Sequence, residues 1–187
     1  MVPRSPRICV FGPSGSGKST FAGMVEQFCV GNGMECRRVK LADPLYRLQR
    51  AAYHLAGVEI GPDAQDQVLM RLLAEQLRRI NPRVLADDFA RRVSTVAPGV
   101  VVVNDDLRDP QIDYPTVRAL GFTLVRVVCS PQNRRLRLAS RADLTVDTTE
   151  SAEAGLDVIE PDLVVTNDGS IADLKAQVGA VLKECQT

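Results

Sequence analysis

The sequence predicts a doubly wound α/β fold, in which helices flank both faces of a parallel sheet of about five strands. Short runs of the chain are apolar at nearly every position, which suits strands covered on both faces. Long helix-like stretches separate these runs in β-α-β alternation. The expected strands lie near residues 8–11, 36–41, 100–103, 123–129 and 163–166. With 187 residues, 45% of them hydrophobic, the chain can bury one sizeable core, so we expect one domain over residues 1–187.

Helix signals fall between these strands. Gly31-Asn32-Gly33 supplies a C-cap for the first helix. Asn81-Pro82 supplies an N-cap and a first-turn proline for the fourth, and Gly121 closes the fifth. The expected helices span about residues 18–30, 45–56, 64–80, 82–93 and 114–120, with a last one from 170 to the end of the chain.

The composition excludes several classes of protein. The chain has 23 basic and 23 acidic residues, and this balance argues against a protein that binds duplex nucleic acid. Its five cysteines are scattered with no C-x-x-C pair, and His54 is the only histidine, so neither a disulfide framework nor a histidine-rich metal site is expected. We find no signal peptide and no apolar run long enough to span a bilayer, and therefore expect a soluble, cytoplasmic protein with no membrane partner.

A glycine-rich stretch follows the first expected strand and leads into the first helix. Its core pattern is Gly12-x-x-x-x-Gly17-Lys18-Ser19. The glycines let the backbone wrap around phosphate oxygens with its N–H groups turned inward, and the helix adds the positive end of its dipole. Lys18 would reach the β- and γ-phosphates of ATP, and the Ser19 hydroxyl would ligand Mg²⁺. The residues expected to bind the nucleotide are Gly12, Ser14, Gly15, Ser16, Gly17, Lys18, Ser19 and Thr20.

A carboxylate, Asp43, ends the second expected strand. Ligands of such sheets bind at the carboxyl ends of the strands, so Asp43 would face the same crevice as the phosphates. It could accept a hydrogen bond from an acceptor hydroxyl, or take the proton from one that attacks the γ-phosphate. The plainer alternative is an N-cap for the helix that follows.

Two carboxylates and an arginine follow the third expected strand. Asp105 and Asp106 both lie where such proteins place the residue that holds Mg²⁺, usually through water. The sequence leaves open which of them does so. Period-2 alternation points Asp106 and Arg108 the same way, which favours this pair as functional. A solvated turn before Pro110 is the alternative.

Two groups of arginines could handle phosphate charge. Arg134, Arg137 and Arg141 follow the fourth expected strand at spacings that put them on one helical face, within an expected small helical lid at about residues 131–150. Forked guanidinium donors there would stabilise a transferring phosphoryl group. A second group could grip an anionic acceptor from the helical segment at about 45–95, although an ordinary solvated basic face is the alternative for either group. Its members are Arg47, Arg50, Arg71, Arg78 and Arg79.

With these motifs in place, the chain resembles the P-loop kinases of small metabolites. It is most similar to the phage-type deoxynucleoside monophosphate kinases, with dephospho-coenzyme A kinase as a related family. The similar segments are 12–20, 41–45, 77–82, Asp106-Leu107-Arg108 and 161–170. Two departures fall where acceptor contacts are expected: Tyr46 and Arg47 stand where the family commonly has a lysine, and residues 147–150 replace a His-x-Ser-Glu-like segment.

The resemblance implies an ATP- and Mg²⁺-dependent kinase that phosphorylates a nucleoside or deoxynucleoside monophosphate to the diphosphate. The implied partner is thus a monophosphate or a nucleoside-like small molecule, and a homodimer is allowed for. The expected catalytic residues are Lys18, Asp43, Arg108, Arg134 and Arg137, and the expected metal-binding residues are Ser19 and Asp106.

Two other functions stay open. In the first, the acceptor is a hydroxyl of a nucleoside, a nucleoside-like metabolite or a coenzyme precursor, and Asp43 is the general base. The second is a nucleotide-hydrolysing switch. The sequence disfavours a switch, because Thr166-Asn167-Asp168-Gly169 lacks the lysine of a guanine-binding N-K-x-D motif.

Overall fold

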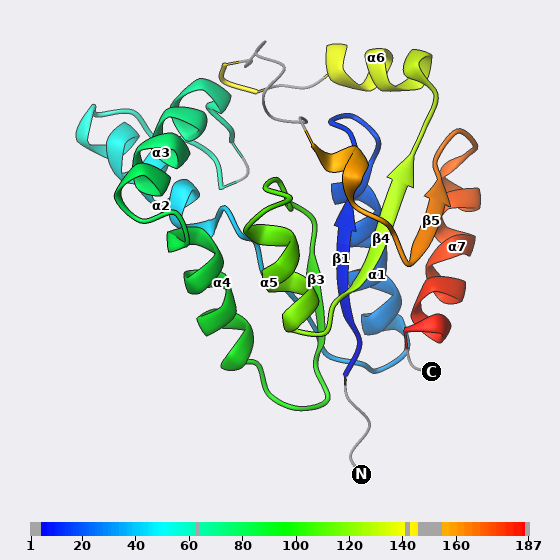
Figure 1. Cartoon of the computed structure of the whole chain (residues 1–187). Helices are drawn as coiled ribbons and strands as arrows, with labels where there is room; N and C mark the ends of the chain where they lie inside the picture. The colour runs from blue at the N-terminus through cyan, green and yellow to red at the C-terminus, as the bar shows by residue number, and fades with distance from the viewer. Residues whose placement is uncertain (1–4, 63, 141–142, 146–154, 186–187) are drawn as a thin grey trace.

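The computed structural model describes residues 5–62, 64–140, 143–145 and 155–185 (Figure 1). Five parallel strands form one sheet in the order β2-β3-β1-β4-β5. They are β1 (Arg7–Phe11), β2 (Cys36–Arg38), β3 (Val101–Asn104), β4 (Thr123–Val128) and β5 (Leu163–Thr166). The expected fold class is confirmed, and β1 lies at the centre, so the loop that follows it opens at the middle of the sheet.

Helices cover both faces of the sheet. On one face, α1 (Lys18–Gly31) and α7 (Ile171–Glu184) pack against alternate strand residues such as Val10 and Val103. On the other face, α4 (Val84–Ser94) and α5 (Asp113–Ala119) pack against Phe11 and Leu124. All of residues 8–11 are fully buried, which explains why this run is apolar at every position.

The segment expected to be helical between residues 45 and 95 folds as three helices, two of which stand to one side of the sheet (Figure 1). These two, α2 (Asp43–Leu55) and α3 (Gln67–Ile80), pack on each other, and no residue of α3 is buried. The prediction that Asn81 caps the fourth helix is wrong. Asn81 ends α3, and its side chain accepts a hydrogen bond from the Arg83 N–H, so α4 begins only at Val84.

The second strand is shorter than expected because a side chain ends its ladder. Asn104 Nδ2 donates to the Val39 carbonyl at 3.0 Å, where a strand would receive a backbone N–H. The chain turns over residues 41–42 and enters α2 at Asp43. Ala42, not Asp43, is the N-cap residue of this helix, so the capping alternative for Asp43 does not hold.

Of the expected lid, α6 (Pro131–Ala139) and residues 143–145 are described. The latter lie against the start of α3: the Leu144 N–H donates to the Gln65 carbonyl at 2.8 Å, and the Val68 N–H donates to Thr145 Oγ1 at 3.1 Å. Arg141 and residues 147–150, which the sequence analysis singled out, lie outside the described residues, as does the end of the chain beyond residue 185.

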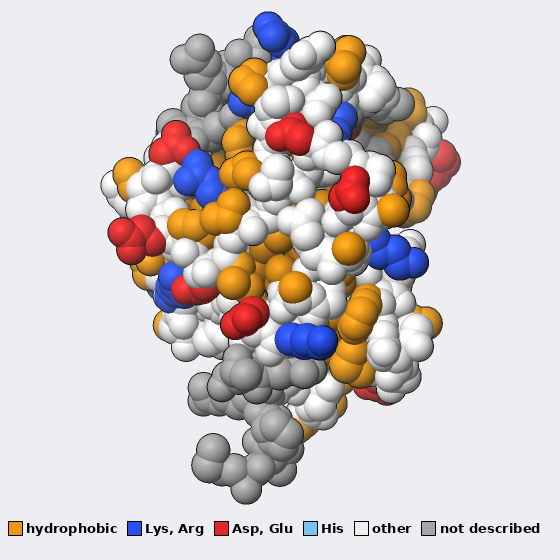
Figure 2. Space-filling view, turned by 90° about the vertical axis from the view of Figure 1, so that its right-hand side faces the viewer, with side chains coloured by type: hydrophobic (Ala, Val, Ile, Leu, Met, Phe, Trp, Pro, Cys, Tyr) orange, Lys and Arg blue, Asp and Glu red, His pale blue; other side chains and the backbone are white. Residues whose placement is uncertain are grey.

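The surface over β5 and α7 carries scattered apolar side chains between charged ones (Figure 2). Val164 and Ile171 are among the exposed apolar residues of these two elements. Apolar side chains scattered in this way are normal on a protein surface. Within the described ranges, no helix is both long enough and apolar enough to cross a membrane.

Candidate active site

The glycine-rich stretch forms a tight loop between β1 and α1. Gly12 has a φ of 137°, and a Cβ there would lie 2.4 Å from the Val127 carbonyl oxygen. Gly17 has a φ of 102°, and a Cβ there would lie 2.1 Å from Asn167 Nδ2. Only glycine fits at either position, because both the backbone angle and the neighbouring atoms exclude a side chain. The positive φ angles at Gly12 and Gly17 thus give the loop the backbone conformation that is typical of phosphate-binding loops.

Lys18 curls back over this loop. Its Nζ donates to the carbonyl oxygens of Gly12 and Pro13, each at 2.8 Å. Ser19 and Thr20 are exposed in the first turn of α1, whereas Ser16 is fully buried. The ammonium group therefore lies at the mouth of the loop, beside the positive end of the helix dipole. All eight residues expected to bind the nucleotide lie in this loop or this first turn.

Helix α6 lies over the loop (Figure 1), and both of its expected catalytic arginines contact it. Arg134 Nε donates to the Ser14 carbonyl at 2.7 Å. Arg137 donates to the Ser16 carbonyl at 3.3 Å and to the Asn167 carbonyl at 2.8 Å. The two guanidiniums thus lie beside the glycine-rich loop.

Asn167, at the turn after β5, is a loop-binding residue that the sequence analysis did not single out. Its Nδ2 donates to the Ser16 carbonyl at 2.7 Å, and the residue is only 6% exposed. Together with Arg137 it fixes the loop from the side of β5. Its position in the similar segment 161–170 was the one signal that could have found it.

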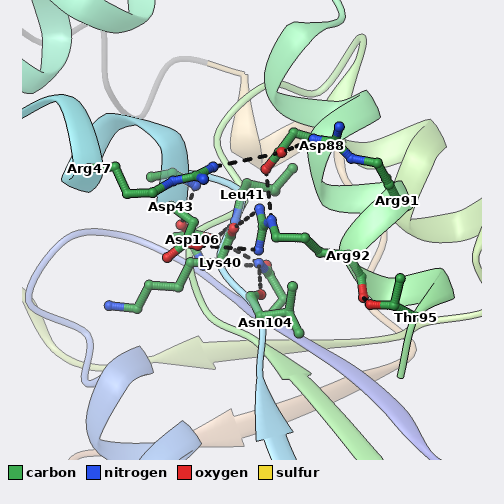
Figure 3. Close-up of polar contacts among 12 residues, drawn as sticks. Lys40, Leu41, Asp43, Arg47, Asp88, Arg91, Arg92, Thr95, Asn104 and Asp106 are labelled. Carbon is green, nitrogen blue, oxygen red and sulfur yellow. Dashed lines mark hydrogen bonds and ion pairs between the residues drawn. The ribbon is translucent and has the colours of Figure 1, made fainter. Parts of the chain in front are cut away.

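Asp106 holds a turn (Figure 3). Its two carboxylate oxygens accept hydrogen bonds from the backbone N–H groups of Leu41 and Ala42, both at 2.8 Å, and one also accepts from Asn104 Nδ2 at 2.6 Å. Burial raises the pKa of the Asp106 carboxyl, and the charge of Asp105 raises it further. The carboxylate is committed to the turn between β2 and α2.

Asp105 is the carboxylate with spare binding capacity. The residue is 3% exposed, and its Oδ1 is buried without a hydrogen-bond partner among the described residues. Its Oδ2 lies 3.5 Å from Arg38, which also pairs with Glu26 of α1. This places Asp105 on the face of the sheet that α1 covers. A buried orphan oxygen is costly, and a cation or its water shell would satisfy it.

A cavity of about 530 Å³ joins the loop to the helical segment. It brings the expected residues Ser19, Asp43 and Arg50 together. The full lining is Ser19, Arg37, Arg38, Val39, Lys40, Asp43, Tyr46, Arg50, Pro62, Gln65, Arg92 and Asp143.

Several expected residues lie elsewhere. Arg108 is exposed and does not contribute to the described lining of this cavity, and neither do Arg47, Arg71, Arg78 and Arg79. β3 ends at Asn104, so strand alternation does not apply to Asp106 and Arg108, and a shared role of these two residues at the ligand stays a prediction.

The cavity carries an excess of positive charge. Of its five basic residues, Arg38 pairs with Glu26 and Asp105, and Arg92 pairs with Asp88 and Asp43. The other three, which are Arg37, Lys40 and Arg50, have no carboxylate partner within the described part of the chain.

Lys40 carries its charge above the Tyr46 ring, with Nζ 4.9 Å from the ring centroid. Burial alone would lower the pKa of Lys40, but Tyr46 and the carboxylates of Asp105 and Asp106 outweigh burial and raise it. The lysine is therefore charged at neutral pH. A site with this charge suits an anion.

The whole architecture resembles solved structures of small-molecule kinases. The APS kinase of Mycobacterium tuberculosis, solved with AMPPNP and APS, is 23% identical with a TM-score of 0.54, and the match covers 97% of this chain and 99% of that chain. The gluconokinase of Sinorhizobium meliloti 1021 is 17% identical with a TM-score of 0.51, over 99% and 94%. The shikimate kinase of Acinetobacter baumannii, solved with shikimate, is 16% identical with a TM-score of 0.51, over 97% and 95%. The fold is that of the P-loop kinases.

At these identities the likeness concerns the fold. No protein-family model matches the chain, and no curated protein matches it either. The sequence resemblance to the phage-type deoxynucleoside monophosphate kinases is therefore neither confirmed nor contradicted. The side chains of the cavity are therefore the evidence for the identity of the acceptor.

Proposed function

We propose that this chain is an ATP- and Mg²⁺-dependent kinase that phosphorylates a nucleoside or deoxynucleoside monophosphate. The observation that carries the proposal is the cavity beside the loop, where Arg37, Lys40 and Arg50 present positive charge without a carboxylate partner in the described residues. An acceptor that already bears a phosphate would supply the missing negative charge. The kinases of similar fold make phosphoryl transfer the reaction to expect.

On the donor side, the loop holds the triphosphate. Backbone N–H groups and the start of α1 bind the phosphate oxygens, and Lys18 exchanges its bonds to the Gly12 and Pro13 carbonyls for the β- and γ-phosphates. Arg134 and Arg137 of α6 neutralise charge on the γ-phosphoryl group. As that group moves, its bond to the β-phosphate oxygen breaks and a bond to an acceptor phosphate oxygen forms.

Ser19 and Asp105 would hold Mg²⁺. We assign this role to Asp105 instead of Asp106, because Asp105 has an unpartnered buried oxygen while Asp106 is committed to the turn. No group of three or more His, Cys, Asp or Glu in the described ranges could hold a metal by itself, which fits a cation shared with substrate phosphates and water. When bound, Mg²⁺ neutralises charge on the β- and γ-phosphates.

On the acceptor side, Arg37, Lys40 and Arg50 bind the acceptor phosphate. Asp43 lies in the same cavity as Ser19, and its side chain is 46% exposed. There it accepts a hydrogen bond from an acceptor hydroxyl and fixes how the acceptor approaches the γ-phosphoryl group.

The position of Asp43 also favours a second candidate function. If the acceptor is itself a hydroxyl, the same carboxylate takes its proton as it attacks the γ-phosphate. The cations of the cavity would then bind another anionic group of the substrate.

A coupled ADP-release assay with ATP·Mg²⁺ distinguishes these functions. The wild-type protein is tested against a panel of nucleosides and nucleoside monophosphates. Turnover with monophosphates alone is the result we expect. Turnover only with unphosphorylated acceptors would support Asp43 as a base. Equal ADP release without any acceptor would overturn the kinase assignment and leave a nucleotide-hydrolysing protein.

A further inference from the structure

Arg92 contacts three groups from the last turn of α4, and two of them belong to residues that line the candidate acceptor site (Figure 3). Its Nε donates to Asp88 Oδ2 at 2.7 Å, and one terminal nitrogen donates to the Lys40 carbonyl at 2.7 Å. The other terminal nitrogen lies 3.8 Å from Asp43 Oδ2. Arg92 lines the cavity, and its side chain is 22% exposed. Within the described residues, no other cation pairs with the Asp43 carboxylate.

Asp88 fixes the orientation of this guanidinium. It lies one helical turn before Arg92 on α4, and its side chain is 11% exposed. Burial opposes its charge, but hydrogen bonds and ion pairs from Arg92 and Arg91 outweigh burial and lower the pKa of the Asp88 carboxyl. Asp88 is therefore ionised at neutral pH. A planar guanidinium that binds an ionised carboxylate through Nε has its two terminal nitrogens directed at fixed points.

The Lys40 carbonyl is one of those points. It belongs to the same turn that Asp106 binds through hydrogen bonds. Asp106 accepts hydrogen bonds from the N–H groups of Leu41 and Ala42, while Arg92 donates one to the preceding carbonyl, that of Lys40. Because α2 begins immediately after this turn, the hydrogen bonds of Asp106 and Arg92 together set where the Asp43 backbone lies. The ion pair to Arg92 then sets the direction of its carboxylate.

We propose that Arg92 is a positioning residue that acts through Asp43. It holds the Asp43 carboxylate toward the acceptor, and Asp88 holds Arg92. This inference rests on the proposed function. Misplacing an acceptor-binding group by about 1 Å can cost on the order of 100-fold in rate, so we expect Arg92→Gln to lower kcat/KM for the acceptor by about 10- to 100-fold.

Arg91 offers a matched control on the same helix turn. It also binds Asp88, but its side chain is 71% exposed, and it contributes neither to the cavity lining nor to the contact with Lys40. Arg91→Gln removes the same charge and should change kcat/KM by less than about threefold. Arg92→Lys keeps the charge but cannot make the three directed contacts at once, so most of the loss should persist.

A double-mutant cycle tests the route through Asp43. Acceptor kcat/KM is measured for wild type, Arg92→Gln, Asp43→Asn and the double variant, with thermal unfolding of each as the folding control. If Arg92 acts through Asp43, adding Arg92→Gln to Asp43→Asn costs less than about threefold more. A full additional loss in the double variant would mean that Arg92 binds the acceptor or supports the fold directly, and would overturn the inference.

Two further results separate this inference from the proposed function. A wild-type protein that turns over monophosphates while Arg92→Gln and Arg91→Gln behave alike would overturn only the inference. A wild type that phosphorylates no acceptor would overturn both. Arg92→Lys keeps the test decisive if Arg92→Gln does not fold, because restoration of full activity by lysine would also contradict a directed guanidinium.

Discussion

The donor loop and the acceptor cavity are built in different ways. The proposed donor loop is one continuous stretch of chain, residues 12–20, whose backbone is shaped by Gly12 and Gly17, and its expected binding groups are largely backbone N–H groups. The acceptor cavity gathers side chains from positions as distant as Ser19 and Asp143. A backbone cradle binds phosphate in any nucleotide, whereas a cavity of side chains can change its ligand one residue at a time. The donor is therefore the fixed part of the proposed reaction, and the acceptor is the variable one.

Substitution of the donor lysine should have the largest effect. Lys18→Ala should lower phosphoryl transfer by at least about 100- to 1,000-fold, because it removes a positioned charge from the transferring group. The bonds of Lys18 Nζ to the Gly12 and Pro13 carbonyls lie within the loop, so the thermal unfolding midpoint should stay close to that of the wild type. Retained activity would remove the loop from the mechanism.

Substitution of Asp43 tests the acceptor cavity. If Asp43 binds the acceptor, Asp43→Asn should raise the acceptor KM by about 10-fold, with the ATP KM unchanged. If Asp43 is a general base, kcat should collapse while acceptor binding stays near normal. Asp87→Asn is a suitable control, because Asp87 is exposed on α4, pairs with Arg83 and does not belong to the described lining of the cavity. An unchanged acceptor KM and kcat would exclude Asp43 from the site.

Asp105 and Asp106 are neighbours in the chain, but substituting them with asparagine should have opposite effects on stability and on the Mg²⁺ requirement. Asp106→Asn leaves one of the Leu41 and Ala42 N–H groups facing an amide NH₂ group, so the free energy of unfolding should fall by about 1–3 kcal/mol. Asp105→Asn removes a buried, poorly paired charge, and stability should change little.

The Mg²⁺ requirement gives the second half of that test. Asp105→Asn should raise the Mg²⁺ concentration needed for half-maximal activity by about 10-fold or more. Denaturant unfolding and a Mg²⁺ titration of the two variants check this pair of effects. The reverse pattern would return the metal role to Asp106.

The smallest expected effect concerns pH and the Asp88 network. The folded-state pKa of Asp88 lies below the ordinary aspartate value of 3.8, so its contribution to stability is present above that pH and is lost as pH falls through the folded value. Wild-type protein should thus lose more stability than Asp88→Asn between about pH 5 and pH 2. Denaturant unfolding across this range measures the difference. Equal acid losses would mean that Arg91 and Arg92 do not hold Asp88 ionised.

The same contrast explains how much could be predicted from the sequence. The donor loop was predictable because its geometry depends on neighbours in the chain, such as Gly17 and Lys18. The position of Asp43 in the same cavity as Ser19 was predictable because Asp43 follows a strand, and strand ends meet at one edge of a parallel sheet. The positions of the strands and their burial on both faces also follow from the apolar runs, whereas the order of the strands in the sheet does not.

Residues whose roles depend on distant elements could not be predicted. Arg92 and Asp88 form an ordinary i,i+4 pair in the sequence, and nothing local indicates that α4 packs where Arg92 meets the Lys40 carbonyl. Strand alternation favoured Asp106 over Asp105 beyond Asn104, where the chain is no longer a strand. The proposal of Asp105 as the metal-binding carboxylate rests instead on its unpartnered buried oxygen, which the sequence does not show.

The cations of the cavity are proposed to bind the acceptor phosphate, and a substitution of Arg50 tests this proposal most directly. Arg79 is the control, since it is also exposed but lies on α3 outside the described cavity lining. We would measure the monophosphate KM and the ATP KM for wild type, Arg50→Gln and Arg79→Gln. Arg50→Gln should raise the monophosphate KM by about 10-fold, with the ATP KM and the Arg79 variant unchanged. An equal monophosphate KM in the two variants, or a rise confined to ATP, would contradict the claim.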